Sequence, residues 1–222
     1  SELQKLGMYS GDDKQLSENI TREKAANVIC GLMNIKNSGN IKSEFSDVSE
    51  DNENSGYIEE LASRNILIGT DGKFNPEREL SYNDAVRAAV VAMGYEKAAE
   101  REGGYPNGYL KIATENGYLS GIKSSDGKIT KRSLLKLFGN LIDKEIMEYK
   151  LSDEKTEYSQ NTKTYIEAYF GIKNEKGKVT ANSFTGIGTD SKSAKGNIKI
   201  DGIEMKNPDS SYEKLIGRRV EY

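Results

Sequence analysis

The chain has 222 residues, of which 35% are hydrophobic and 30% are charged, and its formal net charge is -3. This length allows one large domain or two small ones, with enough apolar residues to build a core. The balanced charge and the lack of a basic tail argue against nucleic-acid binding. The chain has no histidine, which removes the commonest general base, the Ser-His triads and most zinc sites.

The sequence shows no apolar run of the roughly 20 residues that a membrane-spanning helix needs, and no signal peptide is visible. Because the chain opens in the middle of a pattern, we expect a fragment of a longer protein. The single cysteine, Cys30, lies in an apolar helical run. That setting indicates a buried structural thiol rather than a nucleophile.

Three segments of the chain share one pattern, a glycine turn followed by a hydroxyl residue that opens an apolar helical run. The turns end at Gly11, Gly69 and Gly121, and the hydroxyl residues are Thr21, Ser81 and Thr130. A repeat of about 50 to 60 residues predicts one helix-loop-helix unit used three times, with the copies packed together. This organisation favours a modular binding or assembly protein over a catalytic pocket.

Apolar residues at helical spacing follow each hydroxyl residue, which we expect to cap its helix. The three stripes are Ala25, Val28, Ile29, Leu32 and Met33; Ala85, Ala88, Ala89 and Ala92, with Val86 and Val90 beside them; and Leu134, Leu137, Phe138, Leu141 and Ile142. The many alanines of the second stripe predict a close approach between helices. Shorter helices are expected around residues 57–62 and 109–113.

The pattern changes near residue 145. Residues 146–151 alternate as a strand does, 162–170 fit one short helix, and 177–181, 196–202 and 218–222 fit further strands. We therefore expect a repeat domain at 1–144, with units at about 1–36, 45–97 and 103–144. A small β-rich or α+β module would follow at 145–222.

Phe45-Ser46-Asp47-Val48, an apolar helix, and Gly69-Thr70-Asp71-Gly72-Lys73-Phe74-Asn75-Pro76 ahead of a capped helix resemble the S-layer homology (SLH) family. Residues 103–110 are similar to the third unit of clostridial members, and the resemblance covers residues 4–143. It implies a mainly α domain of three lobes with pseudo-threefold symmetry. It also implies an extracellular location, at the cell wall or S-layer of a Gram-positive bacterium, and grooves that bind secondary cell-wall polysaccharide, often through a pyruvylated sugar.

The resemblance also implies which residues contact the glycan, because the family places a threonine-arginine-alanine-glutamate motif at each capped helix start. The N–H groups of a helix N-terminus and an arginine fork both favour a carboxylate. Thr21-Arg22-Glu23-Lys24 keeps the first two residues, Ser81-Tyr82-Asn83-Asp84 keeps the hydroxyl and an acid, and Thr130-Lys131-Arg132-Ser133 keeps the hydroxyl and a cation. The candidate glycan-binding residues are Thr21, Arg22, Glu23, Asp47, Gly69, Asp71, Ser81, Asp84, Thr130, Lys131 and Arg132.

From these departures we expect one groove to use Arg22, another to use Lys131 or Arg132, and the groove at Ser81 to have lost capacity. A tyrosine such as Tyr57 or Tyr105 would supply a sugar-stacking face, since the chain has no tryptophan. Purely structural readings stay open: the hydroxyls are ordinary helix caps, Arg22 is a solvated first-turn residue, and Asp47 and Asp71 are turn formers. The acids of residues 47–53 lack the spacing of a calcium loop, so neither a metal nor a cofactor is expected.

The leading hypothesis is a non-catalytic module that anchors a surface protein to secondary cell-wall polysaccharide. One alternative is a structural S-layer component whose degenerate units mediate self-association and other protein–protein packing. Another is the anchor of a wall-associated enzyme whose catalytic domain lies outside residues 1–222.

Overall fold

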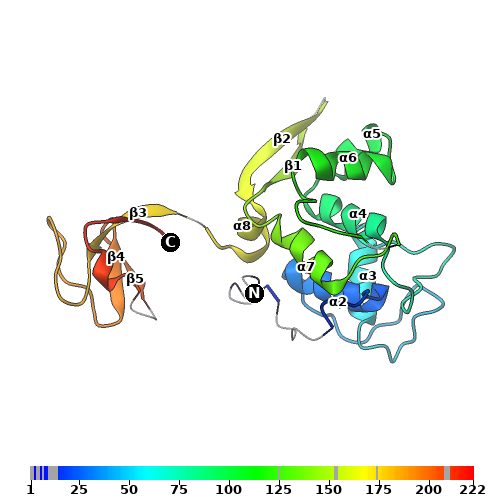
Figure 1. Ribbon diagram of the computed structural model, residues 1–222, viewed down its shortest axis with the longest axis horizontal. Helices are drawn as coiled ribbons and strands as arrows, with labels where there is room; N and C mark the ends of the chain where they lie inside the picture. Colours follow the sequence, from blue (N-terminus) through cyan, green and yellow to red (C-terminus); the bar gives the residue numbers. More distant parts are fainter. Residues whose placement is uncertain are drawn as a thin grey trace. The chain divides into compact units, whose positions relative to one another are not determined.

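A computed structural model describes residues 3, 6, 8, 9, 15–124, 126–152, 155–173, 175–207 and 211–222. The chain forms two compact units, an N-terminal unit of Ser1–Gly171 and a C-terminal unit of Ile172–Tyr222 (Figure 1). The described part of the N-terminal unit is mainly helical, and that of the C-terminal unit is built on a β-sheet. The expected mainly α first part and β-containing second part are confirmed.

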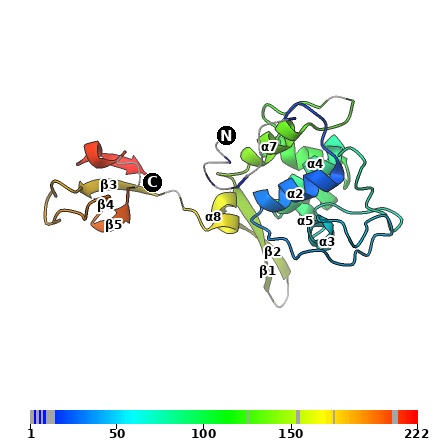
Figure 2. The same cartoon turned by 90° about the horizontal axis from the view of Figure 1, so that it is seen from below.

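Helices dominate the N-terminal unit. They are α2 (Arg22–Leu32), α3 (Ser55–Ser63), α4 (Tyr82–Ala92), α5 (Glu96–Arg101), α6 (Asn107–Glu115), α7 (Lys131–Gly139) and α8 (Tyr165–Phe170). Strands β1 (Glu145–Ser152) and β2 (Lys155–Thr164) form an antiparallel hairpin, with α8 at its base (Figures 1 and 2). The strand expected at residues 146–151 is therefore present.

The three predicted hydroxyl caps begin the three helices, as expected. Thr21 Oγ1 accepts from the Lys24 N–H at 3.4 Å, and Ser81 Oγ accepts from the Asp84 N–H at 3.0 Å. Thr130 Oγ1 accepts from the N–H three residues further on at 3.2 Å. Each cap satisfies a backbone donor that a helix N-terminus otherwise leaves unpaired. The first glycine turn, at residues 7–11, lies outside the described residues apart from Met8 and Tyr9.

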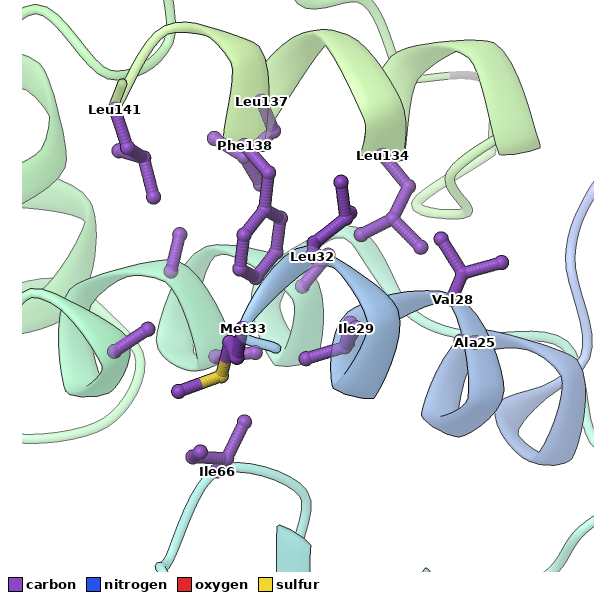
Figure 3. Packing of buried hydrophobic residues seen from close by; sticks show 14 of the residues in the cluster. Ala25, Val28, Ile29, Leu32, Met33, Ile66, Leu134, Leu137, Phe138 and Leu141 are labelled. Carbon is purple, nitrogen blue, oxygen red and sulfur yellow. The ribbon is translucent and has the colours of Figure 1, made fainter. Parts of the chain in front are cut away.

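All three predicted apolar stripes are buried in one core. Figure 3 shows α7 lying over α2, with Leu134 and Phe138 directed at Leu32. Ile66, from the turn after α3, lies on the other side beside Met33 (Figure 3). The alanines of α4 are fully or almost fully buried, which fits their predicted role in close helix packing.

A closed ring of backbone hydrogen bonds joins the segments just ahead of α2, α4 and α7. The N–H of Leu80 donates to the carbonyl of Ile20 at 2.8 Å, and the N–H of Ile129 donates to that of Leu80 at 3.3 Å. The N–H of Ile20 closes the ring by donating to the carbonyl of Ile129 at 3.2 Å. All three side chains are buried, so these backbone groups are satisfied by one another at the centre of the unit.

A second set of hydrogen bonds repeats this relation further out. In each case the first residue of a helix donates to the carbonyl three residues ahead of the next cap. The three bonds run from Arg22 to Arg78, from Tyr82 to Gly127 and from Lys131 to Glu18. The three helix starts therefore contact one another in the same way, although they lie far apart in the sequence.

Helix α8 belongs to the core of the N-terminal unit. Tyr165 is fully buried and its hydroxyl donates to the carbonyl of Leu32 at 2.9 Å, while the Tyr169 hydroxyl donates to that of Ala92 at 2.6 Å. The units consequently divide after Gly171, not after residue 144, where the sequence pattern changes. That change marks the switch from helices to a hairpin, whereas the core continues into α8.

The C-terminal unit holds an antiparallel sheet in the order β5-β4-β3-β6, and β4 and β3 are its central strands. The strands are β3 (Lys176–Ala181), β4 (Asn197–Ile200), β5 (Ile203–Lys206) and β6 (Arg219–Glu221). Val179, Ile198 and Ile200 form its small core. The sequence patterns predicted β3, β4 and β6 but missed β5, which has only four residues and so shows only a short alternation.

Candidate functional site

A cavity of about 600 Å³ lies where the start of α2, the start of α4 and the turn after α3 meet. We call it the arginine cavity. Its lining residues are Arg22, Ile66, Leu67, Ile68, Thr70, Arg78, Ser81, Asp84, Arg87, Glu100, Tyr105 and Lys128. The structure thus brings together Arg22, Ser81 and Asp84, which the sequence had assigned to two different repeats.

Arg22 forms the inner wall of this cavity and is only 2% exposed. Its Nε donates to the Phe74 carbonyl at 2.8 Å and its Nη2 to the Ile68 carbonyl at 2.7 Å. Its Nη1 donates to Asp84 Oδ2 at 3.2 Å. Burial lowers the pKa of Arg22 and Asp84 opposes that effect, and an arginine keeps its charge in proteins. Every nitrogen of this guanidinium therefore already donates to the protein.

Two other cations of the cavity are more accessible. The Arg78 side chain is 55% exposed, and its Nη2 lies 3.7 Å from Asp84 Oδ2. Lys128 is half-buried and its amine forms no ion pair within the described residues. Arg87 is different, because its guanidinium donates to the carbonyls of Asn65 and Ile66. Arg78 and Lys128 are thus the cations best placed to meet a bound anion.

Sequence reasoning missed Arg78 and Lys128, because it looked for cations just after each cap. Arg78 lies three residues before Ser81, and Lys128 lies two residues before Thr130. Arg78 and Lys128 reach the cavity because the residues ahead of one cap contact the start of another capped helix. The backbone hydrogen bonds from Arg22 to Arg78 and from Tyr82 to Gly127 are examples of this contact. A search of the segments ahead of the caps would have found both.

Tyr105 gives the arginine cavity an aromatic side chain that is half exposed. Its hydroxyl donates to Asp84 Oδ1 at 3.0 Å, and burial, together with Asp84, raises its pKa. The ring also packs edge-on against Tyr109, with centroids 6.3 Å apart. Tyr105, one of the two tyrosines expected to face a sugar, therefore lies in the cavity, while Tyr57 lies on α3 and is not among its lining residues.

A second cavity, of about 480 Å³, occupies the corresponding place at the start of α2. Lys131 enters it from the first position of α7, as Arg22 enters the arginine cavity from the first position of α2. Lys24 and Asn27 line it from α2, three and six residues after the cap, as Asp84 and Arg87 do from α4. Lys131 Nζ also lies 5.4 Å from the ring centroid of Tyr9.

Asp47 shapes the loop at residues 69–76. Its two carboxylate oxygens accept from the N–H groups of Phe74 and Asn75, both at 2.8 Å. Burial acts to raise the pKa of Asp47, but these backbone hydrogen bonds outweigh it and lower the pKa below its ordinary value. This carboxylate therefore fixes the loop that carries Phe74 to the Arg22 guanidinium.

Gly69 and Asp71 have conformational roles in the same loop. A Cβ on Gly69 would lie 2.3 Å from the Phe45 ring, so only glycine fits there. Asp71 and Gly72 have φ of 52° and 70°, and Thr70 and Lys73 exchange backbone hydrogen bonds around them. This is the two-residue turn that favours left-handed residues.

Three further sequence candidates lie outside both cavities. Glu23 Oε1 accepts from Asn54 Nδ2 at 2.8 Å. Thr130 is half-buried as a helix cap and Arg132 is exposed on α7. None of the three is a lining residue of either cavity.

Two further findings concern only the described parts of the chain. In them, no three His, Cys, Asp or Glu side chains gather in a way that could hold a metal ion. Their helices are all too short or too polar to cross a membrane.

Residues 44–86 match the S-layer homology domain, so the chain contains a domain of that family. The matched segment includes Asp47, the loop at 69–76 and the start of α4. The chain is 23% identical over 153 residues to the middle cell wall protein of Brevibacillus brevis. It is 24% identical over 153 residues to a surface layer protein of Brevibacillus choshinensis. Each alignment covers 66% of this chain but only 14% of the relative.

Proposed function

We propose that this chain is a non-catalytic module that anchors its protein to the cell wall by binding an acidic secondary wall polysaccharide. The S-layer homology domain and the two relatives support a cell-surface location and an anchoring role. The arginine cavity is the observation that carries the finer proposal. It holds three arginines and one lysine against two carboxylates, an excess of positive charge that favours an anionic ligand.

The groups of the cavity suit a sugar that bears a carboxylate, such as a pyruvylated sugar. The Arg78 fork offers paired charge-assisted donors to a carboxylate, and Lys128 adds a second cation. Asp84 can accept from a sugar hydroxyl, and Tyr105 offers an aromatic surface to the ring. Because Arg22 is buried and hydrogen-bonded, it keeps the cavity wall in one conformation. Binding therefore costs little conformational entropy of that wall.

We further propose that the N-terminal unit has three lobes, with repeats at about 1–36, 45–97 and 103–144. The closed ring through Ile20, Leu80 and Ile129 supports this arrangement, because each repeat donates and accepts one equivalent hydrogen bond. Under this arrangement, the two cavities are equivalent grooves between neighbouring lobes.

Binding of purified wall polysaccharide, measured by calorimetry, tests the proposed function. Arg78→Gln and Lys128→Gln should each weaken binding about tenfold or more, since a hydrogen bond to a charged group contributes about 1.5–3 kcal/mol. Binding should also weaken as salt rises. Arg132→Gln is the control, because Arg132 is exposed and lines neither cavity. Equal affinity of wild type and Arg78→Gln, or an equal loss in the control, would show that the site is misassigned.

A second candidate function is a structural S-layer component whose repeats mediate self-association. One relative is itself a surface layer protein, and the charged positions after Ser81 and Thr130 have departed from the family motif. Sedimentation velocity at increasing protein concentration separates the two. Assembly in the absence of any affinity for polysaccharide favours this second function.

A further inference from the structure

The four-stranded sheet of the C-terminal unit has one face toward its small core and one face away from it. Burial alternates along the central strands β3 and β4, so Val179, Ile198 and Ile200 are buried between exposed or half-buried neighbours. Directly opposite residues of antiparallel strands share a face, and the register therefore extends the outer face onto β5 and β6. We call this outer face the basic face, because it carries five cations. They are Lys176, Lys178, Lys199, Lys206 and Arg219.

The carboxylates of the basic face compensate only part of this positive charge. On the described strands they are Glu204 and Glu221. Glu204 Oε1 accepts from the Ala194 N–H at 2.9 Å and from Asn197 Nδ2 at 3.0 Å, so it fixes the residues ahead of and at the start of β4. Glu221 Oε1 lies 3.7 Å from Lys176 Nζ. The face therefore keeps an excess of cations.

Lys178 and Arg219 lie side by side on this face. They are directly opposite in the register of β3 and β6, both are exposed, and neither side chain forms an ion pair within the described residues. Asp201 lies close to Lys178, and its Oδ1 accepts from the Lys178 backbone N–H at 3.1 Å. Like charges placed directly opposite destabilise a sheet. An anion that contacts both cations would remove this repulsion.

The side chains of the basic face suit a ligand that is held by charge alone. The outer positions of the described strands carry no aromatic and no large apolar side chain. They therefore offer no stacking surface for bases or sugar rings and no group that inserts into a bilayer. Four of the five cations are lysines, which bind anions as point charges without the paired geometry of an arginine fork. A long anion that lies across several strands can contact several of these groups at once.

We propose that the basic face binds a linear anionic polymer of the cell wall by charge alone, without selecting its monomers. Residues 172–222 contain ten lysines and arginines against seven acids, although the whole chain has a net charge of -3, so positive charge is concentrated in this unit. An excess of one charge attracts a polymer of the opposite charge. The S-layer homology domain and the relatives indicate a cell-surface location, which favours a wall polymer over a nucleic acid. This inference goes beyond the proposed function, because it concerns the other unit and requires no acidic sugar.

The test uses two chemically unrelated polyanions and the full 222-residue chain. Sodium polyphosphate and poly-L-glutamate are each titrated into ¹⁵N-labelled protein, and the backbone amide signals are followed by NMR. Dextran is the uncharged polymer. Both polyanions should shift signals of β3, β4 and β6, and dextran should shift none. The logarithm of the binding constant should fall linearly with the logarithm of the salt concentration, because binding releases counterions.

Lys178→Gln combined with Arg219→Gln removes two cations and the repulsion between them, so the sheet should stay folded. The double variant should raise the Kd of polyphosphate about tenfold or more and reduce the salt slope by about two. Lys36→Gln combined with Arg132→Gln is the matched control, because it changes the net charge equally at exposed positions of the N-terminal unit. The control should bind polyphosphate as wild type does. Unchanged signals of β5 before titration show that the double variant is folded.

Several results overturn this inference. Polyphosphate leaves the signals of the sheet unchanged, or binds the double variant as tightly as it binds the control. Poly-L-glutamate gives no response where polyphosphate binds, or dextran binds as well as either. Phosphatidylglycerol vesicles bind the chain while both polyanions give no response, which would identify a lipid surface as the ligand. Signals of residues 78–87 report the arginine cavity separately, so each of these results leaves the proposed function standing.

Discussion

Replacement of Arg22 by methionine tests whether this residue is a structural element of the cavity wall. Methionine is apolar and of similar length, so the change removes three donors and the charge while keeping much of the packing. The carbonyls of Ile68 and Phe74 lose their partners, and Asp84 keeps the longer ion pair with Arg78 and the hydrogen bond from Tyr105.

The magnitude follows from those losses. A buried acceptor left without its donor costs about 1–3 kcal/mol, and two carbonyls are affected. Removing one partner of a buried ion pair costs about 3–5 kcal/mol, although Asp84 retains Arg78 and is 22% exposed at its side chain. We expect the free energy of unfolding to fall by about 3–5 kcal/mol, the range for a broken buried pair.

Urea unfolding followed by far-UV circular dichroism measures this change, because every α-helix among the described residues lies in the N-terminal unit. Arg132→Met is the matched control at an exposed helix position and should change stability by less than about 0.5 kcal/mol. Arg22→Lys should fall between the two, since one ammonium replaces only part of the fork. If Arg22→Met is as stable as Arg132→Met and only polysaccharide binding is lost, Arg22 is a ligand-binding residue and the structural argument is refuted.

Three other predictions concern pH, glycine positions and the two units. Because the folded-state pKa of Asp47 is lowered, its stabilisation is complete above the unfolded value of about 3.9 and is lost as pH falls through the folded pKa. Wild type should therefore lose more stability than Asp47→Asn between pH 5 and pH 3 in urea titrations, and equal losses would contradict this. Gly108→Ala should unfold the protein at lower urea, since its Cβ would lie 1.9 Å from a carbonyl oxygen of α5. Gly139→Ala, which meets open space, should gain about 0.4–1 kcal/mol, and similar effects of the two changes would refute the packing described around α5 and α6. A fragment ending at Gly171 should keep the cooperative urea unfolding and the helical circular dichroism of the full chain, because the core cluster of the N-terminal unit contains no residue beyond 171 among those that the structure describes; loss of the helical signal would contradict this.

The sequence predicted the parts of the fold that depend on local chemistry. Thr21, Ser81 and Thr130 begin helices because a hydroxyl ahead of an apolar run satisfies a nearby N–H, and spacing alone reveals that. The end of the N-terminal core was harder to predict. Tyr165 joins that core through contacts with residues more than a hundred positions earlier, and no local pattern records such a contact.

The candidate site, too, could be predicted from local sequence patterns only in part. The sequence pattern predicted Arg22 and Asp84 as candidates, but the acceptors of Arg22 lie 46, 52 and 62 residues further along the chain. Its burial by those groups is a tertiary property that helix position does not reveal. Arg78 and Lys128 were missed for the same reason, because they reach the cavity from segments that lead into neighbouring caps.

The ring through Ile20, Leu80 and Ile129 has a consequence for the proposed three-lobed arrangement, because it limits how many repeats such a unit can contain. With one repeat removed, one N–H and one carbonyl of the ring would lose their partners in a dry interior, and a fourth repeat would find no free group to join. The backbone hydrogen bonds of the ring therefore accommodate three such segments, and no side chain takes part in them. A change in the number of repeats in such a chain should therefore occur by whole sets of three.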